Sequence, residues 1–186
     1  MRKLACVALI AAAPAFAQED GAGPNLVIDV TGDTSGRIVI DLLPEIAPKH
    51  VEQIAALAEE GAYNGVAFHR VIPGFMAQTG DVQCGLEGAS CPAGIGGSQR
   101  PDIPAEFSDV PFDRGIVGMA RAQNPNSAHS QFFIMFQEGH FLNGQYTVVG
   151  RVIEGMGVVD TIKIGAGPNG AIIGPPDRME SVTVER

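Results

Sequence analysis

A single arginine, Arg70, stands in a segment that otherwise carries large apolar groups and a side-chain amide. Within that segment Pro73-Gly74 is a turn pair, because proline presets φ to about −65° and glycine takes the positive φ that follows in a type II turn. Residues 68–81 therefore predict a strand, a tight turn and a second strand. Side chains alternate along the outgoing strand, which directs Phe75, Ala77 and Thr79 one way and Met76, Gln78 and Gly80 the other. A permanently charged guanidinium is thus expected beside apolar groups, where its rigid donors can be directed at a substrate.

Two further blocks of sequence complete a pattern. The second runs from Gly118 to Ala122 and continues from Ser130 to Ile134, and the third covers Phe141 to Gly150. In this order, the three blocks closely resemble the signature of the cyclophilin-type peptidyl-prolyl cis-trans isomerases. The resemblance implies an enzyme that accelerates rotation about X-Pro peptide bonds and assists the folding of exported proteins. Its partners would be proline-containing segments of unfolded or exported proteins, and it would need no cofactor.

The implied reaction asks little covalent chemistry of the protein. Rotation about an X-Pro bond has a barrier of about 18–20 kcal/mol, but no bond is made or broken. The catalyst therefore needs no nucleophile, general base or metal; it must weaken the conjugation of the prolyl nitrogen. A guanidinium directed at that nitrogen favours the twisted state over the planar one. The resemblance assigns this catalytic role to Arg70 and implies that Gln78 holds the arginine in place.

The resemblance also implies which residues bind substrate. The pocket for the proline ring would be formed by Phe75, Met76, Phe133 and Leu142. The substrate main chain would be bound by Gln131 and the backbone of Arg121, in a groove kept shallow by Ala120 and Ala122. The expected lining is completed by His69, Phe141 and Tyr146, and a structural role for His69 is the alternative.

Three of these positions depart from the commonest family pattern. Arg121 stands where asparagine is common, Phe141 where tryptophan is common, and Tyr146 where histidine is common. The missing indole N–H at position 141 implies that cyclosporin binding is possible but weak, while isomerisation is unaffected. The three substitutions resemble those of bacterial exported members of the family.

The N-terminus has the three parts of a secretory signal peptide. Arg2 and Lys3 precede an apolar run from Leu4 to Ala13, and Ala15-Phe16-Ala17 matches a cleavage site. We expect residues 1–17 to be a signal peptide, residues 18–24 a flexible leader and residues 25–186 a cyclophilin-like isomerase domain. Cleavage would leave no stable membrane anchor and would direct the protein to the periplasm or outside the cell. A lipid anchor at Cys6 and an uncleaved N-terminal anchor are the alternatives.

Two cysteines, Cys84 and Cys91, follow the expected cleavage site. Export into an oxidising compartment makes a disulfide between them the favoured prediction, with two unpaired thiols as the alternative. No metal is expected, because two cysteines are too few ligands and no histidine shows ligand spacing near them, neither His50, His69, His129 nor His140.

The remaining sequence predicts a mainly β domain. The chain has 186 residues, with 24 glycines and 13 prolines, which favours many short strands joined by turns. A hairpin is expected over residues 26–42, a helix starts at Pro48 and stops before Gly61, and a helix-like segment covers residues 158–162. About eight strands and two helices emerge. Patterning allows an antiparallel barrel or a sandwich; the resemblance selects a closed eight-stranded antiparallel β-barrel capped by two α-helices.

The charge balance argues against nucleic-acid binding, and the intact motif argues against a non-catalytic binding module. The net charge is −9 and no basic stripe is present, so nucleic-acid binding is not expected. A non-catalytic peptide-binding or holdase module that uses the same groove is the alternative function. Such a binder has no need of Arg70, which makes the isomerase the favoured hypothesis.

Overall fold

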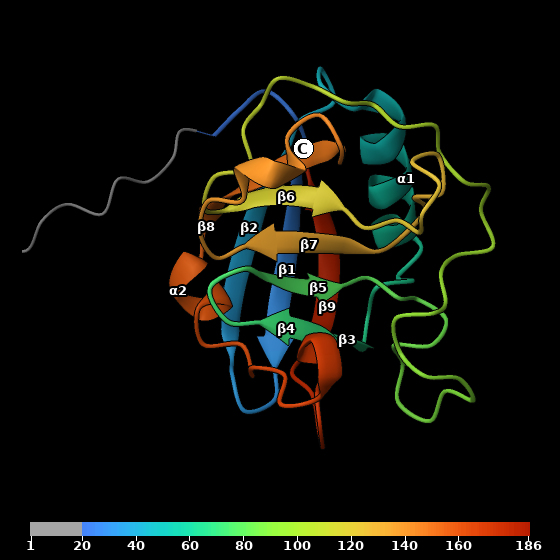
Figure 1. Cartoon of the computed structure of the whole chain (residues 1–186), viewed down its shortest axis with the longest axis vertical. Coiled ribbons are helices and arrows are strands. Elements are labelled where there is room, and N and C mark those ends of the chain that lie inside the picture. Colours follow the sequence, from blue (N-terminus) through green and yellow to red (C-terminus); the bar gives the residue numbers. More distant parts are fainter. Residues whose placement is uncertain (1–19) are drawn as a thin grey trace, which may run out of the picture.

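A computed structural model describes residues 20–186, which fold into one curled, nine-stranded antiparallel sheet with helices packed on it (Figure 1). The strands are β1 Asn25–Thr31, β2 Gly36–Leu42, β3 Val66–Ala67, β4 Arg70–Ile72, β5 Met76–Thr79, β6 Ile116–Met119, β7 Phe132–Met135, β8 Val148–Glu154 and β9 Arg178–Glu185. The α-helices are α1 Pro48–Glu59 and α2 Met156–Val159, and short 3-10 helices cover η1 His140–Leu142 and η2 Pro168–Gly170.

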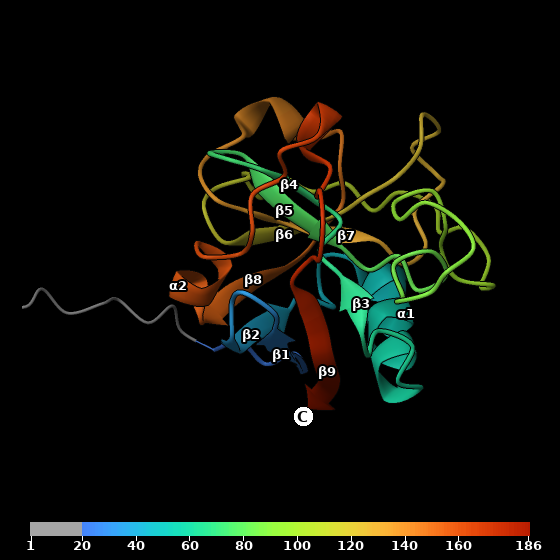
Figure 2. The same cartoon turned by 90° about the horizontal axis from the view of Figure 1, so that it is seen from below.

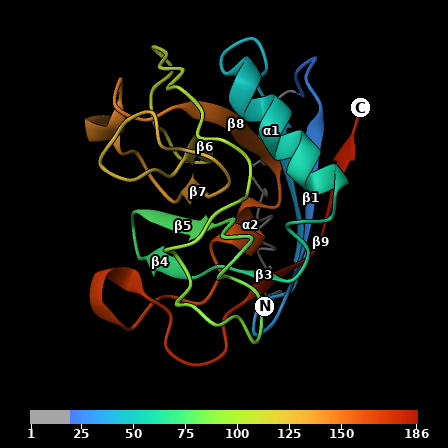
Figure 3. The ribbon, with the colours of Figure 1, turned by 90° about the vertical axis from the view of Figure 1, so that its right-hand side faces the viewer.

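The sheet does not close into the expected eight-stranded barrel. Its strand order is β3-β9-β1-β2-β8-β6-β7-β5-β4, and no ladder joins the two outer strands β3 and β4. These strands are nevertheless consecutive in sequence, separated by Phe68 and His69 alone. At this break the backbone changes partners, since Phe68 N donates to Asp177 O and His69 N donates to Gln78 O. The sheet therefore curls until its edges meet at one short segment, as Figure 3 shows, while the hydrogen-bonded ladder stays open.

The first hairpin, the first helix and the central turn lie where the sequence places them, whereas the helix-like segment expected over residues 158–162 is observed as α2 Met156–Val159. β1 and β2 pair as an antiparallel hairpin, and α1 begins at Pro48 and ends just before Gly61, whose φ is 71°. At the central turn Phe75 N donates to Ile72 O, and Gly74 has a φ of 67°, as a type II turn requires. α1 packs against β9, whereas α2 lies beside β2 at the opposite end of the molecule (Figure 2).

Buried side chains form two clusters, which lie on opposite faces of the half of the sheet that contains β4, β5 and β7. Alternate residues of β7 divide between them: Phe132 and Ile134 enter the main core, while Phe133 and Met135 enter a smaller second cluster. Phe75 packs against this second cluster, on the side of Met76 and away from Ala77. The expected alternation fails at Phe75 because this residue belongs to the turn and not to β5. Both faces of this half of the sheet are therefore apolar.

The long connection between β5 and β6 is organised by one buried carboxylate. Asp81 is fully buried and accepts hydrogen bonds from four backbone N–H groups, those of Gln83, Cys84, Gly94 and Gly96, at 2.7–3.2 Å. The Cys84–Cys91 disulfide lies in the same segment, with a Cα–Cα distance of 5.3 Å. Asp81 thus fixes a glycine-rich loop at residues 94–96 against the end of β5.

The expected signal peptide lies outside the described residues. Of the expected leader, residues 20–24 have no regular strand or helix; Gly21 N donates to Asp41 Oδ2 at 3.2 Å, and Pro24 O accepts from Leu42 N at 3.1 Å. Over residues 20–186, neither α-helix has the length and apolar character that crossing a bilayer demands.

Candidate active site

Four neighbouring strands place Arg70, Gln78, Phe133 and Gly118 in one row across the sheet. Arg70 of β4 pairs with Gln78 of β5, Gln78 pairs with Phe133 of β7, and Phe133 pairs with Gly118 of β6. Gly118 leaves the space that the ring needs, since a Cβ there would lie 2.5 Å from Phe133 Cζ. Paired residues project from the same face of a sheet, so the cation, the amide and the ring share one surface.

The Arg70 guanidinium is half-buried and held by neutral acceptors. Its Nη1 donates to Gln78 Oε1 at 3.0 Å, and Asn169 accepts from its Nε and Nη2 at 3.0 Å each. Burial lowers the pKa of Arg70, and the Tyr146 hydroxyl opposes that shift. Among the described residues no carboxylate forms an ion pair with Arg70. Its positive charge is therefore available to a ligand.

Beside Arg70 lies an apolar hollow of about 300 Å³. Its lining consists of Arg70, Phe75, Met76, Gln78, Ala120, Arg121, Phe133, Phe141, Leu142 and Tyr146. The Phe133 ring forms a wall that is itself supported, because it stacks on Phe112 with centroids 5.8 Å apart and meets Tyr146 edge-on at 5.9 Å. Phe141 is 66% exposed and stands at the rim. All four residues of the expected proline pocket thus come together here.

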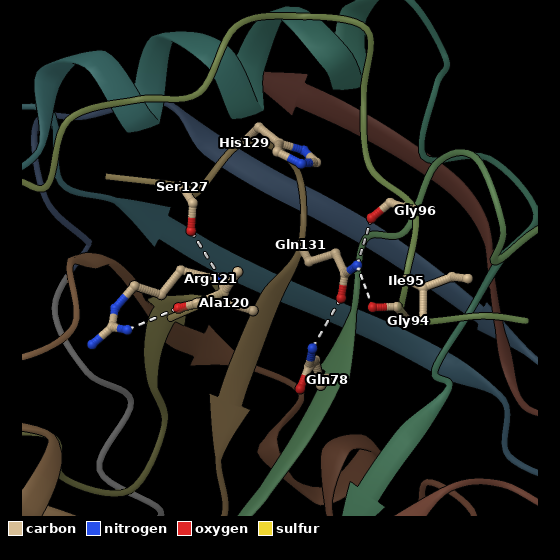
Figure 4. A pocket seen from close by; sticks show the side chains of 10 residues that line it. Gln78, Gly94, Ile95, Gly96, Ala120, Arg121, Ser127, His129 and Gln131 are labelled. Atoms are coloured by element: carbon tan, nitrogen blue, oxygen red, sulfur yellow. Dashed lines mark hydrogen bonds between the residues drawn. The ribbon is translucent and has the colours of Figure 1, made fainter. Parts of the chain in front are cut away.

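A second hollow of about 280 Å³ adjoins the first (Figure 4). Its lining is Gln78, Gly94, Ile95, Gly96, Ala120, Arg121, Ala122, Ser127, His129 and Gln131. Gln78, Ala120 and Arg121 line both hollows, so the two form one continuous groove. The sequence reasoning missed Gly94, Ile95, Gly96, Ser127 and His129, which lie on loops. One feature of the sequence could have indicated this loop. Asp81 directly follows a strand and precedes a glycine-rich segment, and such a carboxylate can bind the backbone N–H groups of that segment and hold it beside the strand.

A chain of side-chain amides joins Arg70 to the second hollow. Gln78 receives the Arg70 hydrogen bond on its oxygen and donates its Nε2 to Gln131 Oε1 at 2.9 Å. Gln131 in turn donates to Gly94 O at 3.1 Å and to Gly96 O at 2.8 Å, as Figure 4 shows. Each amide has its orientation fixed by a donor on one side and an acceptor on the other.

Arg121 lies between the two hollows, with its guanidinium turned onto Tyr146. The guanidinium carbon is 4.4 Å from the Tyr146 ring centroid, and its donors contact the backbone oxygens of Gln145 and Ala122. Local acceptors and the aromatic ring therefore engage this second cation of the groove.

His69 lines neither hollow, contrary to the expected lining. It is 9% exposed, and a Cβ on Gly94 would lie 3.0 Å from its Cδ2, so the ring packs beneath the 94–96 loop. Burial lowers the pKa of His69, with Asp81 opposing the shift, which keeps the ring neutral near pH 7. The structural role considered for His69 is the one that this position supports. In the part of the chain that the structure describes, no cluster of three histidine, cysteine or acidic side chains could hold a metal.

Comparison with known proteins identifies the family. The family model for "Cyclophilin type peptidyl-prolyl cis-trans isomerase/CLD" matches residues 27–184. A probable peptidyl-prolyl cis-trans isomerase of Brucella suis biovar 1 is 60% identical over 153 residues, which cover 81% of this chain and 78% of the relative.

Solved structures agree with this assignment. Cyclophilin AquaCyp293 from Hirschia baltica is 29% identical, with a TM-score of 0.70 over 86% of this chain and 73% of its own. A cyclophilin-type isomerase of Cryptosporidium parvum, crystallised in the presence of the dipeptide Ala-Pro, is 25% identical, with a TM-score of 0.73 over 87% of this chain and 99% of its own. The chain therefore belongs to the cyclophilin-type peptidyl-prolyl cis-trans isomerase family, and it is an enzyme that isomerises peptidyl-prolyl bonds.

Proposed function

We propose that the groove binds a proline-containing segment with the proline ring in the apolar hollow and the Arg70 guanidinium directed at the prolyl nitrogen. The single observation that carries this assignment is a half-buried cation at the edge of an apolar hollow, held by uncharged partners. The Cryptosporidium parvum relative was crystallised in the presence of Ala-Pro, a dipeptide with the X-Pro bond that the proposed substrate also has.

The proposed chemistry is selective stabilisation of the twisted peptide bond. As conjugation is lost, the prolyl nitrogen becomes pyramidal and gains a lone pair that accepts a hydrogen bond from Arg70. This interaction is stronger in the transition state than in the planar ground state, as catalysis requires. Substrate polar groups would bind beside it, at the Gln131 amide and the Arg121 backbone.

The hydrogen bond from Arg70 is too weak to supply the whole reduction of the rotation barrier. Unaided isomerisation takes tens to hundreds of seconds, so turnover in milliseconds needs roughly four decades, or about 5–6 kcal/mol. A hydrogen bond to a charged group contributes about 1.5–3 kcal/mol. The remainder has to come from the apolar walls, which fix the ring while the carbonyl swings and keep water from the charge.

The test is a peptide isomerisation assay on the purified wild type and on Arg70→Ala. We expect kcat/KM to fall by about 10- to 100-fold in the variant, since a charge-assisted hydrogen bond is lost. Arg37→Ala is the matched control, because Arg37 is an exposed arginine paired with Glu185 outside the groove. If Arg70→Ala retained the wild-type rate, the assignment of Arg70 would be wrong; full protection of clients from aggregation by the same variant would favour the holdase.

We further propose that the enzyme acts on exported proteins in the periplasm or outside the cell. The signal-peptide pattern of residues 1–17 and the Cys84–Cys91 pair support this location. Expression of the full chain in a bacterium, followed by fractionation and N-terminal sequencing, should find the mature protein outside the cytoplasm and starting at Gln18. Cytoplasmic protein that keeps Met1 would contradict the proposal. Cyclosporin should bind weakly, because Phe141 offers no indole N–H at the rim.

A further inference from the structure

Asn169 is 99 residues from Arg70 in sequence but holds one edge of its guanidinium. Arg70 Nε donates to the backbone oxygen of Asn169, and Arg70 Nη2 donates to Asn169 Oδ1, both at 3.0 Å. One residue therefore supplies two acceptors, from its main chain and its side chain, to neighbouring donors of a rigid fork. Neither the three sequence motifs nor the lining of the groove includes this residue.

The backbone of Asn169 has the conformation that this double contact needs. With φ 55° and ψ 30°, it is the one non-glycine residue with a positive φ in the stretch from 20 to 186. Asparagine tolerates this left-handed conformation better than most side chains do. It also presents an uncharged acceptor, so it can orient the guanidinium without neutralising its charge.

The segment that carries Asn169 is anchored on both sides of Arg70. Ala171 forms a β-bridge with Arg70, Ile172 N donates to His69 O at 3.1 Å, and Gly165 N donates to Val71 O at 3.0 Å. Gly170 allows the close approach, because a Cβ there would lie 2.4 Å from Ile72 Cγ1. The position of Asn169 relative to Arg70 is thus set by backbone contacts and does not depend on the arginine side chain.

A count of donors shows what this arrangement leaves for a ligand. A guanidinium has five N–H donors, of which Asn169 takes two and Gln78 takes one. The second Nη1 donor has only the weak acceptor Met76 Sδ near it, at 4.0 Å. The second Nη2 donor has no acceptor among the described residues. Both remaining donors belong to the terminal nitrogens of a side chain that lines the apolar hollow.

We propose that Asn169 is a positioning residue of the isomerase, which fixes the guanidinium so that the two remaining donors of Arg70 serve the substrate. The proposal rests on the catalytic role of Arg70 proposed above. A free arginine side chain samples many rotamers, and each turnover would otherwise have to select one of them. Asn169 is itself exposed, so its contribution belongs to activity and not to the stability of the fold.

The test uses Asn169→Gly, which keeps the positive φ and the backbone acceptor and removes the side chain that carries Oδ1. We expect kcat, measured by NMR exchange at saturating peptide, to fall by about 3- to 10-fold, as for one charge-assisted hydrogen bond near solvent. The peptide Kd and Tm should stay near the wild-type values, and the Arg70 Nε–H signal should broaden. Ile164→Ala, an exposed site in the same segment, is the control and should leave all four quantities unchanged.

A double-mutant cycle separates this role from a general effect on the fold. In an Arg70→Lys background, which lacks the fork, Asn169→Gly should cause no further loss of kcat. The proposal would be overturned if Asn169→Gly lowered kcat equally in the wild-type and Arg70→Lys backgrounds. It would also be overturned if the single variant kept the wild-type kcat, or if only its Tm fell. If Arg70→Ala itself kept wild-type activity, the failure would lie with the role of Arg70 and would be recognised before Asn169 is considered.

Discussion

Gln131 accepts the side-chain N–H of Gln78 at 2.9 Å and donates to two backbone oxygens of the 94–96 loop. The same Gln78 holds Arg70, so one amide chain couples the cation to the wall of the second hollow. In the candidate active site, side-chain amides therefore link the 94–96 loop to Arg70, in addition to the hydrogen bonds by which Asp81 holds that loop.

Gln131→Glu should disrupt this chain. A carboxylate cannot donate to Gly94 O and Gly96 O, and its charge would repel both oxygens. We expect kcat/KM to fall by about tenfold or more, measured in the peptide assay. Gln123→Glu introduces the same charge at an exposed site and should retain activity. Equal activity of the two variants would show that the amide chain is dispensable.

Gly118→Ala should narrow the apolar hollow. The added Cβ would lie 2.5 Å from Phe133 Cζ and 2.6 Å from Phe112 Cε1, so the Phe133 ring has to shift. Overpacking of this kind costs about 1–3 kcal/mol of stability. Peptide titration should show a several-fold weaker Kd, and urea unfolding should show the lower stability. Gly157→Ala is the matched control, because nothing lies within 4 Å of its added Cβ; unchanged affinity in Gly118→Ala would contradict the expected wall movement.

Stability should fall in acid through Glu106. Burial alone would raise the pKa of Glu106, but hydrogen bonds from the His50 ring and from the backbone N–H groups of His50 and Lys49 outweigh it, and the net pKa is lowered. A lowered folded-state pKa stabilises the protein above the unfolded pKa, and the stability is lost as pH falls through the folded value. The carboxylate also caps α1, whose own N-cap residue Ala47 offers no side-chain acceptor.

Urea unfolding of the wild type and of Glu106→Gln from pH 7 to pH 3 checks this linkage. At pH 7 the variant should be less stable by about 1–2 kcal/mol, as expected for charge-assisted hydrogen bonds near the surface. The difference should shrink as the pH falls below 4.5, the ordinary pKa of a glutamate carboxyl group. A difference that stays constant over the whole pH range would exclude Glu106 as the titrating group.

Reduction of the Cys84–Cys91 disulfide should destabilise the fold more than it slows the reaction. The bridge closes a short loop, for which chain entropy gives roughly 2.5 kcal/mol at most. Asp81 holds the loop by separate hydrogen bonds, and Arg70 contacts neither cysteine, so kcat should change less than about twofold. Unfolding with and without reductant measures the effect, and a Cys84→Ser/Cys91→Ser variant should not respond to reductant. A large loss of kcat on reduction would show that the loop depends on the bridge.

Sequence reasoning succeeded where the information was local. The Pro73-Gly74 turn, the first hairpin and α1 depend on residues that are neighbours in the chain, and all three are confirmed. These elements follow from turn chemistry and side-chain periodicity, which one sequence contains.

Predictions failed where distant segments decide the geometry. The closed barrel was wrong because the strand expected before the turn breaks at Phe68-His69 and changes partners there. Phe75 faces the wrong way for a strand residue because it lies in the turn. Asn169 reaches Arg70 only through the fold, and no periodic pattern or spacing marks such a contact.

The two outer strands of the sheet, β3 and β4, comprise two and three residues and belong to one continuous segment. Exposed strand edges are the usual templates on which foreign extended chains add themselves, and long flat edges promote aggregation. An isomerase that binds proline-containing peptides meets extended chains during its reaction. Because both edges of its sheet are only a few residues long and lie within a single segment, such peptides find almost no strand edge to pair with.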